Sequence, residues 1–518
     1  MKKLILLVFL VTTLLPAAAG AQAPGPFLSG MFTDNMVLQR GMRDPIWGWT
    51  KPGAQVRVSM DGKTATATAG TDGKWLAHLG PFRAGGPYTL TVSSVEHVWG
   101  LRRASGRHAG GIYTLPVEGP ETTTISNVLV GDVWICSGQS NMQFGIANGN
   151  NADQEIANAN YPEIRLFTVP MTIALAPRAN LPAPRPDGAS QWSVCTPDTV
   201  KTGGWGGFTA VGYFFGRDLY NALKVPIGLI HTSWGGTVAE AWTSASALNA
   251  MPDFQPAIAK VAADAAAQQP AGKNPNIVTV LYNGMIAPVI PFGMKGVIWY
   301  QGESNAQRAY QYRTLLPTMI QDWRARWGEG PFPFLIVQLA NFRASNPAPG
   351  ENDWAELREA QLMTAESLPK TGLAVTIDIG AANTIHPKDK QDVGMRLALA
   401  AENIAYHEKV DDSGPIYRSM KREGNRIRLS FRDVDGGLVA HGDKLQGFAI
   451  AGPDRHFVWA DAVIDGDTIV VSSPQVPDPA AVRYAWAINP VCNLYNKAGL
   501  PASPFRTDQW PGLTERKR

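Results

Sequence analysis

A serine stands in the motif Cys136-Ser137-Gly138-Gln139-Ser140-Asn141-Met142, where an apolar run gives way to a helical segment. A side chain at such a point is exposed at the carboxyl edge of a sheet. The amides that open the helix can stabilise negative charge developing on a substrate oxygen, which is what acyl transfer requires. The structural alternative is a serine that only caps the helix. A Gly-x-Ser-x-Gly elbow would need glycine where Met142 stands, so the spacing disfavours that motif.

Two more polar segments, residues 232–237 and 299–305, follow apolar runs in the same way. The first contains Gly235-Gly236, which lets backbone amides approach a ligand closely. The second supplies side-chain amides from Gln301 and Asn305. A tight turn and a polar helix cap would explain each segment separately. Because the carboxyl ends of parallel strands meet at one edge, the three segments together predict one site rich in hydrogen-bond donors.

A nucleophilic serine needs a base, and histidine is the usual base near neutral pH. The chain has eight histidines, of which His231, His386 and His407 lie in the central region. Only His386, in Ile385-His386-Pro387, is predicted to follow a strand on the edge that carries Ser140. We therefore predict that His386 takes the proton of Ser140, and that water activated by the same histidine later releases the acyl group.

The central region shows unbroken apolar strands that alternate with amphipathic helices, a pattern typical of a parallel sheet covered on both faces. The predicted strands are 164–169, 227–234, 296–301, 334–339 and 373–379, and the predicted helices are 211–223, 278–288, 309–327, 354–367 and 390–406. Before and after this region, apolar residues alternate at the strand period between Gly- and Asp-rich turns. We predict an α/β domain over 126–410, between β-sandwich-like domains over 22–125 and 411–518.

Residues 1–21 have two lysines, a short apolar run and small residues at the end, as in a secretory signal peptide. We expect a periplasmic or secreted protein without a membrane anchor. The formal charge of +3 and the lack of a basic run indicate no nucleic-acid partner. Cys136, Cys195 and Cys492 allow at most one internal disulfide and form no zinc motif, and we expect buried thiols.

The motifs occur in an order that resembles the sialate O-acetylesterases, within the wider SGNH hydrolase superfamily. The similarity covers nearly the whole mature chain. It rests on Gly131-Asp132-Val133-Trp134, Gly138-Gln139-Ser140-Asn141-Met142, Trp234-Gly235-Gly236-Thr237, Gln301-Gly302-Glu303-Ser304-Asn305 and Ile385-His386-Pro387, and further on residues 36–40, 281–285 and 501–506. The resemblance implies a flavodoxin-like catalytic domain, no metal and no organic cofactor. It implies a serine carboxylic ester hydrolase that removes acetyl groups from sugar hydroxyls.

Carried onto this sequence, the resemblance assigns Ser140 as nucleophile, His386 as base and Gly236 as an oxyanion donor. Either Gln301 or Asn305 would supply a further donor, and the spacing does not decide between them. The superfamily places an aspartate three residues before the histidine, but Asn383 stands there. Asp378 is the nearest upstream acid. We expect a Ser-His dyad, with Asp378 as a tentative orienting acid whose alternative role is to cap the loop.

The resemblance implies acetylated sialic acid or another acetylated oligosaccharide or polysaccharide as substrate, and an acetylated hemicellulose such as xyloglucan or xylan is the main alternative. Four aromatic residues near the motifs are candidates for stacking against sugar rings or for core packing, namely Trp205, Trp234, Trp299 and Tyr300. A different hypothesis is a carbohydrate-binding protein with a vestigial hydrolase core. The intact Ser140 and His386 argue against it.

Overall fold

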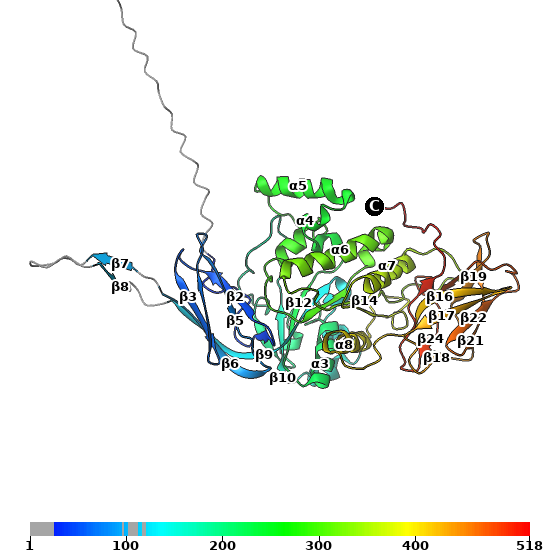
Figure 1. The fold of residues 1–518 in the computed structure, drawn as a ribbon, viewed down its shortest axis with the longest axis horizontal. Helices are drawn as coiled ribbons and strands as arrows, with labels where there is room; N and C mark the ends of the chain where they lie inside the picture. The colour runs from blue at the N-terminus through cyan, green and yellow to red at the C-terminus, as the bar shows by residue number, and fades with distance from the viewer. Residues whose placement is uncertain (1–24, 96–97, 102–111, 116–120) are drawn as a thin grey trace, which may run out of the picture.

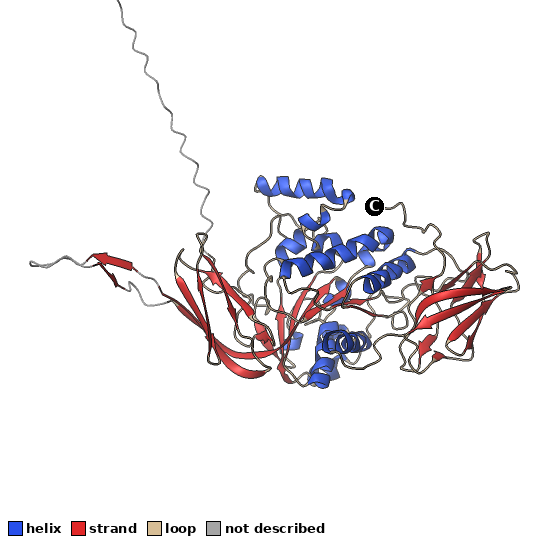
Figure 2. Ribbon diagram, in the orientation of Figure 1, coloured by secondary structure: helices blue, strands red, loops and turns tan. Residues whose placement is uncertain are grey.

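The computed structural model describes residues 25–95, 98–101, 112–115 and 121–518. The predicted signal peptide, 1–21, lies outside the described residues. Three regions follow one another along the long axis: an N-terminal β region, a central α/β region and a C-terminal β region (Figure 1). Helices are concentrated in the central region, and strands make up most of the other two (Figure 2).

A mixed sheet forms the centre of the molecule, with parallel pairing throughout except at one edge, where β11 is antiparallel to β10. Its strands, in spatial order, are β11 (Trp192–Cys195), β10 (Tyr161–Thr168), β12 (Ile227–Ser233), β9 (Thr122–Gly138), β13 (Gly296–Tyr300), β14 (Phe334–Val337) and β15 (Thr371–Ala374). The runs β12, β13 and β14 are buried along their whole length, as expected of strands covered on both faces.

Helices cover both faces of this sheet. On one side α3 (Ala210–Leu223) packs against α8 (Gln391–Tyr406), and on the other α6 (Ala309–Trp327) packs against α7 (Asp353–Ser367) (Figure 1). The shorter or more peripheral helices are α1 (Ser140–Gln143), α2 (Ala152–Ala157), α4 (Ala245–Leu248) and α5 (Gln255–Ala266). This α/β arrangement with additional sheets agrees with the predicted fold class at that level.

Two predicted elements differ from the structure. The strand predicted over 373–379 is β15, Thr371–Ala374, so residues 375–379 belong to the loop that follows it. The helix predicted over 278–288 is a short π-helix, Tyr282–Ile286. In both places the hydrophobic pattern of the sequence correctly indicated buried apolar residues. It did not indicate where the strand or helix begins and ends, because that depends on backbone hydrogen bonds.

The N-terminal β region shares a strand with the central sheet. Strand β9 pairs with β6 (Gly85–Val95) and β1 (Val37–Gln39) through its first half and with β12 and β13 through its second. The remaining N-terminal strands are β2 (Asp44–Trp49), β3 (Gln55–Met60), β4 (Lys63–Thr68), β5 (Lys74–Leu79), β7 (Val98–Leu101) and β8 (Ile112–Leu115). One hydrophobic core therefore runs from Phe27 to Ala405.

The C-terminal β region has a core of its own, enclosed by two four-stranded antiparallel sheets. The sheets are formed by β16 (Ile416–Glu423), β17 (Arg426–Arg432), β22 (Thr468–Ser472) and β21 (Asp461–Asp465), and by β20 (Phe457–Trp459), β19 (Phe448–Ala451), β23 (Ala481–Tyr484) and β25 (Phe505–Arg506). A separate pair joins β18 (Leu438–Ala440) to β24 (Leu494–Asn496).

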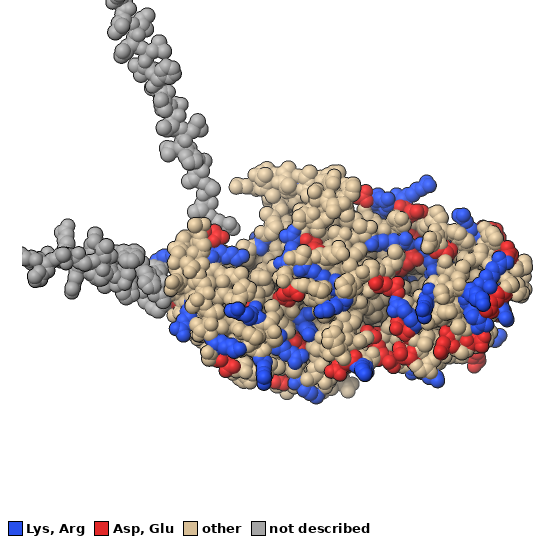
Figure 3. All heavy atoms as spheres, viewed as in Figure 1, with Lys and Arg blue, Asp and Glu red and all other residues tan. Residues whose placement is uncertain are grey.

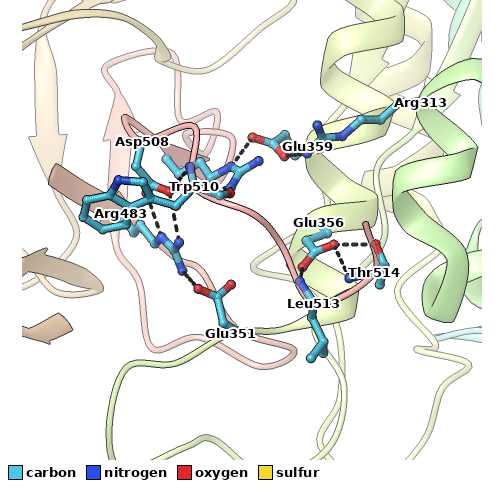
Figure 4. A network of polar contacts seen from close by, with 10 residues as sticks. Arg313, Glu351, Glu356, Glu359, Arg483, Asp508, Trp510, Leu513 and Thr514 are labelled. Carbon is cyan, nitrogen blue, oxygen red and sulfur yellow. Dashed lines mark hydrogen bonds and ion pairs between the residues drawn. The ribbon is translucent and has the colours of Figure 1, made fainter. Parts of the chain in front are cut away.

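The last residues of the chain return from this region to the central helices (Figure 4). Arg506 of β25 binds Glu359 of α7, which also pairs with Arg313 of α6. Glu356 of α7 accepts a hydrogen bond from the Leu513 amide at 2.5 Å. The C-terminal segment thus joins the C-terminal β region to the helices that cover the central sheet.

Surface and thiol features also bear on the sequence analysis. Basic and acidic side chains are interspersed over the face drawn in Figure 3. Among the described residues, no helix combines the length and apolarity needed to cross a bilayer. The three cysteines are free; Cys136 and Cys195 are buried, and Cys492 is partly exposed.

Candidate active site

The backbone around Ser140 is shaped by a close approach of two strands. Gly138 ends β9 with φ of +140°, and a Cβ there would lie 2.1 Å from the Tyr300 carbonyl oxygen of β13. Only glycine fits this position. The Gln139 amide then donates to the same carbonyl at 2.9 Å, and α1 begins at Ser140. The half-buried Ser140 therefore lies at the carboxyl edge of the sheet, as predicted.

The structure brings Ser140 and His386 together. His386 Nε2 lies 2.9 Å from Ser140 Oγ, across 246 residues of sequence. His386 stands in the loop between β15 and α8, and its amide donates to Thr384 Oγ1 at 3.1 Å. Burial lowers the pKa of His386, and the nearby charge of Lys390 lowers this pKa further. A neutral imidazole in hydrogen-bond contact with a serine hydroxyl is equipped to act as a general base.

Asn141, the residue after the nucleophile, joins three loops. Its Nδ2 donates to the Ile385 carbonyl at 3.0 Å and to Glu303 Oε1 at 2.6 Å. Its Oδ1 accepts from Lys390 Nζ at 2.7 Å. The carbonyl belongs to the residue directly before His386, so Asn141 holds the histidine loop against the start of α1.

Lys390 and Glu303 form the charged part of this cluster. Lys390 is fully buried, and its Nζ lies 4.9 Å from the ring centroid of Phe144 and 5.3 Å from that of Tyr300. Burial lowers the pKa of Lys390 to about 7, against the opposing effect of the Glu303 and Asp389 charges. Burial has the opposite effect on the acid and raises the pKa of Glu303, because in both groups it disfavours the charged form. The two groups occupy a site where water does not compete for their hydrogen bonds with Asn141.

Sequence reasoning missed Asn141, Glu303 and Lys390 as site residues. All three lie in or beside the motifs already recognised, and Lys390 follows His386 by four residues. The sequence offered one signal for them, which is polar residues at positions predicted to be buried. A lysine at the start of a core-facing helix, for example, needs a hydrogen-bond or charge partner. Which partner it has depends on contacts between loops that are distant in sequence.

Asp378 does not lie at the histidine. Its carboxylate forms a bidentate ion pair with Arg396 of α8, at 2.6 Å to Nη1 and 2.8 Å to Nη2. Tyr495 also donates to it, at 3.3 Å. Among the described residues no hydrogen bond joins Asp378 to His386. Neither the tentative role as orienting acid nor the alternative role as a cap of the loop backbone has a hydrogen bond among the described residues; the Asp378 carboxylate is taken up by the side chains of Arg396 and Tyr495.

The paired glycines lie beside the nucleophile. A Cβ on Gly235 would lie 3.3 Å from Ser140 Cβ, and the Gly235 amide donates to Gln143 Oε1 at 2.7 Å. Gly236 is exposed with φ of +72°, and its amide has no acceptor among the described residues. Ser140, as the first residue of α1, has an amide with no intrahelical acceptor. Gly236 and Ser140 thus retain free amide donors, one in the glycine loop and one at the start of α1.

Gln301 and Asn305 are engaged elsewhere, contrary to the expectation that one of them donates to an oxyanion. Both are buried. Gln301 Nε2 donates to the Thr237 carbonyl at 3.1 Å and to Asn305 Oδ1 at 2.6 Å, and Asn305 Nδ2 donates to Glu240 Oε2 at 2.9 Å. Their amides hold the glycine loop to the strand beside it. The sequence could not reveal this, because both roles need the same residue types.

A second serine and histidine are in contact within β12. His231 Nε2 lies 2.5 Å from Ser233 Oγ, and both side chains are buried. Burial lowers the pKa of His231 to about 4.

Among the described residues no group of three or more His, Cys, Asp and Glu side chains is arranged to hold a metal ion.

Comparison with known proteins agrees with the resemblance predicted from the motifs. Residues 130–403 match the family described as carbohydrate esterase, sialic acid-specific acetylesterase. The sialate O-acetylesterase of Pongo abelii is 32% identical, with 92% of each chain covered. The Homo sapiens enzyme is 31% identical, again with 92% of each chain covered.

A solved structure gives the same result in three dimensions. A carbohydrate acetylesterase from Xanthomonas citri superposes with a TM-score of 0.79 at 40% identity, covering 94% of this chain and 100% of that one. The predicted enzyme class, an esterase, is confirmed by these matches. The chain belongs to the sialic acid-specific acetylesterase family of carbohydrate esterases.

Proposed function

We propose that this protein hydrolyses O-acetyl esters on sugar hydroxyls, with Ser140 as nucleophile and His386 as general base. The observation that carries the proposal is the 2.9 Å contact between Ser140 Oγ and His386 Nε2 at the carboxyl edge of the sheet. The activity class follows the printed names of the relatives, which are a carbohydrate acetylesterase and sialate O-acetylesterases.

In the first half of the reaction, His386 Nε2 accepts the hydroxyl proton as Ser140 Oγ attacks the acetyl carbonyl carbon. The carbonyl oxygen gains the negative charge of a tetrahedral intermediate, and the amides of Ser140 and Gly236 are the free donors for it. The carbon–oxygen bond to the sugar then breaks. The departing sugar oxygen takes the proton from His386, which leaves an acetyl ester on Ser140.

The second half uses the same groups. His386 accepts a proton from water, whose oxygen attacks the acetyl carbon, and the bond to Ser140 breaks as the serine recovers its proton. Acetate leaves. Both halves require one fixed position of the imidazole, which the 3.0 Å bond from Asn141 Nδ2 to the Ile385 carbonyl provides.

The substrate class within the family is open to two proposals. An acetylated sialic acid is favoured by the named relatives of Pongo abelii and Homo sapiens. An acetylated plant hemicellulose such as xyloglucan or xylan is the alternative. Acetate release from a panel of both kinds of glycan separates them, because a preference for either should appear as a higher kcat/KM.

Fluorophosphonate labelling tests the nucleophile. The reagent should label the wild type and a Ser304→Ala control but not Ser140→Ala, and acetate release from 4-nitrophenyl acetate should follow the same pattern. Ser304 is a matched control because it is partly exposed in a neighbouring loop of the same edge. Labelled and active Ser140→Ala protein would overturn the proposal. We also expect activity to persist in EDTA.

We further propose that the central domain is a flavodoxin-like SGNH hydrolase domain. The sheet has six parallel strands in the order β10-β12-β9-β13-β14-β15. If the outer strand β10 is left aside, the other five, numbered along the chain, have the order 2-1-3-4-5 of flavodoxin-like sheets, which supports the proposal. We propose the domain limits 22–125, 126–410 and 411–518. The separate C-terminal core supports the last of them, and cleavage by a protease between residues 407 and 414 would test it.

We also propose that the protein is exported and acts in the periplasm or the medium. The sequence of residues 1–21 supports export to the periplasm or the medium. Mass measurement of the N-terminal peptide of the exported protein tests this, and cleavage after Ala21 is the expected result. Protein that retains the leader inside the cell would contradict the proposal.

A further inference from the structure

Trp205 is the one exposed ring among the four aromatic residues considered for sugar stacking. Trp299 and Tyr300 are fully buried within β13 and pack in the hydrophobic core. Trp234 is half-buried. Trp205 keeps 40% of its surface exposed. Trp205 is therefore the one of the four rings with enough exposed surface to pack against a ligand without displacing core contacts.

The indole touches the general base. Its ring centroid lies 4.7 Å from that of His386, in an edge-on arrangement of 79°. A second edge-on contact, at 5.3 Å, joins it to Phe144. These contacts fix the orientation of the ring and leave the rest of its surface free for a ligand.

Hydrogen bonds tie the loop that carries Trp205 to the segment that follows α1. The Trp205 carbonyl accepts hydrogen bonds from the Gly145 amide and from Asn148 Nδ2, both at 3.0 Å. The next residue, Gly206, has φ of +82°, and a Cβ there would lie 2.2 Å from Asn148 Nδ2. The backbone position is therefore set before any ligand arrives, which lowers the entropic cost of binding.

A second exposed apolar side chain is connected to the same site. Met171, 46% exposed, accepts a hydrogen bond at its Sδ from Gln143 Nε2 at 3.7 Å. Gln143 is the last residue of α1, the helix that begins with Ser140, and its Oε1 holds the Gly235 amide. Apolar surface is thus available on two segments that border the nucleophile.

The chemistry of the reaction locates the sugar relative to these residues. When the acetyl group moves to Ser140, the departing sugar oxygen must lie within hydrogen-bond distance of His386 Nε2. A ring hydroxyl is one bond from its pyranose carbon, so the pyranose ring itself must lie close to the imidazole. The exposed aromatic surface available there belongs to Trp205, and the C–H face of a pyranose packs well on an indole.

We infer that Trp205 forms a sugar-binding platform that packs against the pyranose ring whose acetyl ester is cleaved. The inference rests on the proposed function, because it uses His386 as the group that protonates the leaving oxygen. Its ligand class is an acetylated pyranose, and it adds a residue that selects sugar esters over esters of small alcohols.

The experiment compares two substrates in one set of variants. β-D-Glucose pentaacetate offers a pyranose ring, whereas 2,2,2-trifluoroethyl acetate offers a similarly activated small alcohol with nothing to stack. We expect Trp205→Ala to lower the ratio of kcat/KM for the sugar ester to that for the small ester by about tenfold or more, mainly through KM. Trp205→Tyr should restore most of the ratio.

Two further variants keep the result interpretable. Trp459→Ala removes another exposed indole, in the C-terminal β region, and should leave the ratio unchanged. Ser140→Ala should lose both activities. If Trp205→Ala lowers both substrates equally, Trp205 only supports His386 and the platform is wrong. If Ser140→Ala keeps activity, the proposed function fails, whatever Trp205 does.

Discussion

Two serine and histidine pairs lie near the same edge of the central sheet, and they differ in what surrounds them. His231 Nε2 contacts Ser233 Oγ at 2.5 Å, and His386 Nε2 contacts Ser140 Oγ at 2.9 Å. The shorter contact belongs to residues that alternate on one face of a single strand and are 7% and 3% exposed. A close serine and histidine contact therefore does not by itself identify a catalytic pair.

Access and neighbouring donors separate the pairs. Burial lowers the pKa of His231 to about 4, so it stays neutral near pH 7, but His231 and Ser233 are both buried and expose little surface to an ester. Ser140 begins a helix, borders the glycine loop and is only half-buried. The pair assembled from distant loops has the features of a reaction site, and the pair within a strand has those of a packed core.

The largest expected difference between the pairs is the effect of removing each serine. Ser140→Ala should lower kcat for 4-nitrophenyl acetate by about 10⁴-fold or more, because the nucleophile is lost. Ser233→Ala should keep activity within about tenfold and act mainly on stability. Steady-state kinetics and thermal unfolding of both variants measure this. A reversed pattern would make Ser233 the nucleophile.

The next effect concerns how the distant pair is held together. Asn141→Ala removes the tether between α1 and the histidine loop, and we expect a loss of about 10²-fold in kcat from the misplaced base. Asn403→Ala, which breaks an exposed bond to Asp412, is the matched control and should not change kcat. Unchanged kcat in folded Asn141→Ala protein would show that the loop holds His386 unaided.

A smaller effect should appear in the pH profile of Lys390→Met. Burial lowers the pKa of His386, the charge on Lys390 lowers it further, and His386 must be neutral to act as a base. Removing that charge should raise the pKa of His386, so the acid limb of kcat/KM should move to higher pH. Glu303 and Asp389 are the other charges that act on Lys390, and an unpaired Glu303 carboxylate would act in the same direction.

Lys388→Met, an exposed change in the same loop, is the control for that profile. Its acid limb should coincide with that of the wild type. Movement of the acid limb to lower pH in Lys390→Met would contradict the inference that the charge on Lys390 lowers the pKa of His386. Urea unfolding of both proteins checks that the shift is not a loss of fold.

The smallest effect on catalysis is expected for Asp378→Asn. The aspartate pairs with Arg396 rather than His386, so kcat should fall by far less than the ~10⁴-fold seen when a triad aspartate is neutralised. Stability should fall instead, by about 3 kcal/mol, because a buried guanidinium loses its partner. A full triad-sized loss of kcat in folded protein would show that Asp378 acts on the histidine after all.

The sequence allowed Ser140 and His386 to be predicted because each stands directly after a buried strand, and strand order along one edge makes such loops neighbours. It did not reveal the cluster of Asn141, Glu303 and Lys390. Those contacts join residues 162 and 249 positions apart, and no local periodicity reports them. It also left Gln301 and Asn305 open as oxyanion donors, since an amide that holds a loop and one that faces a substrate look alike in sequence.

By itself the sequence determined the α/β centre, the strand-rich flanks, the family and the two residues proposed to carry the chemistry. Each of these follows from hydrophobic periodicity or from short motifs, which are local properties. Only the tertiary structure decided that Asp378 belongs to Arg396, that the N-terminal β region shares β9 with the catalytic sheet, and that Trp205 stays exposed against His386. Each of these groups has several possible partners in the sequence. Which partner it contacts depends on which groups the completed fold brings within a few ångströms of one another.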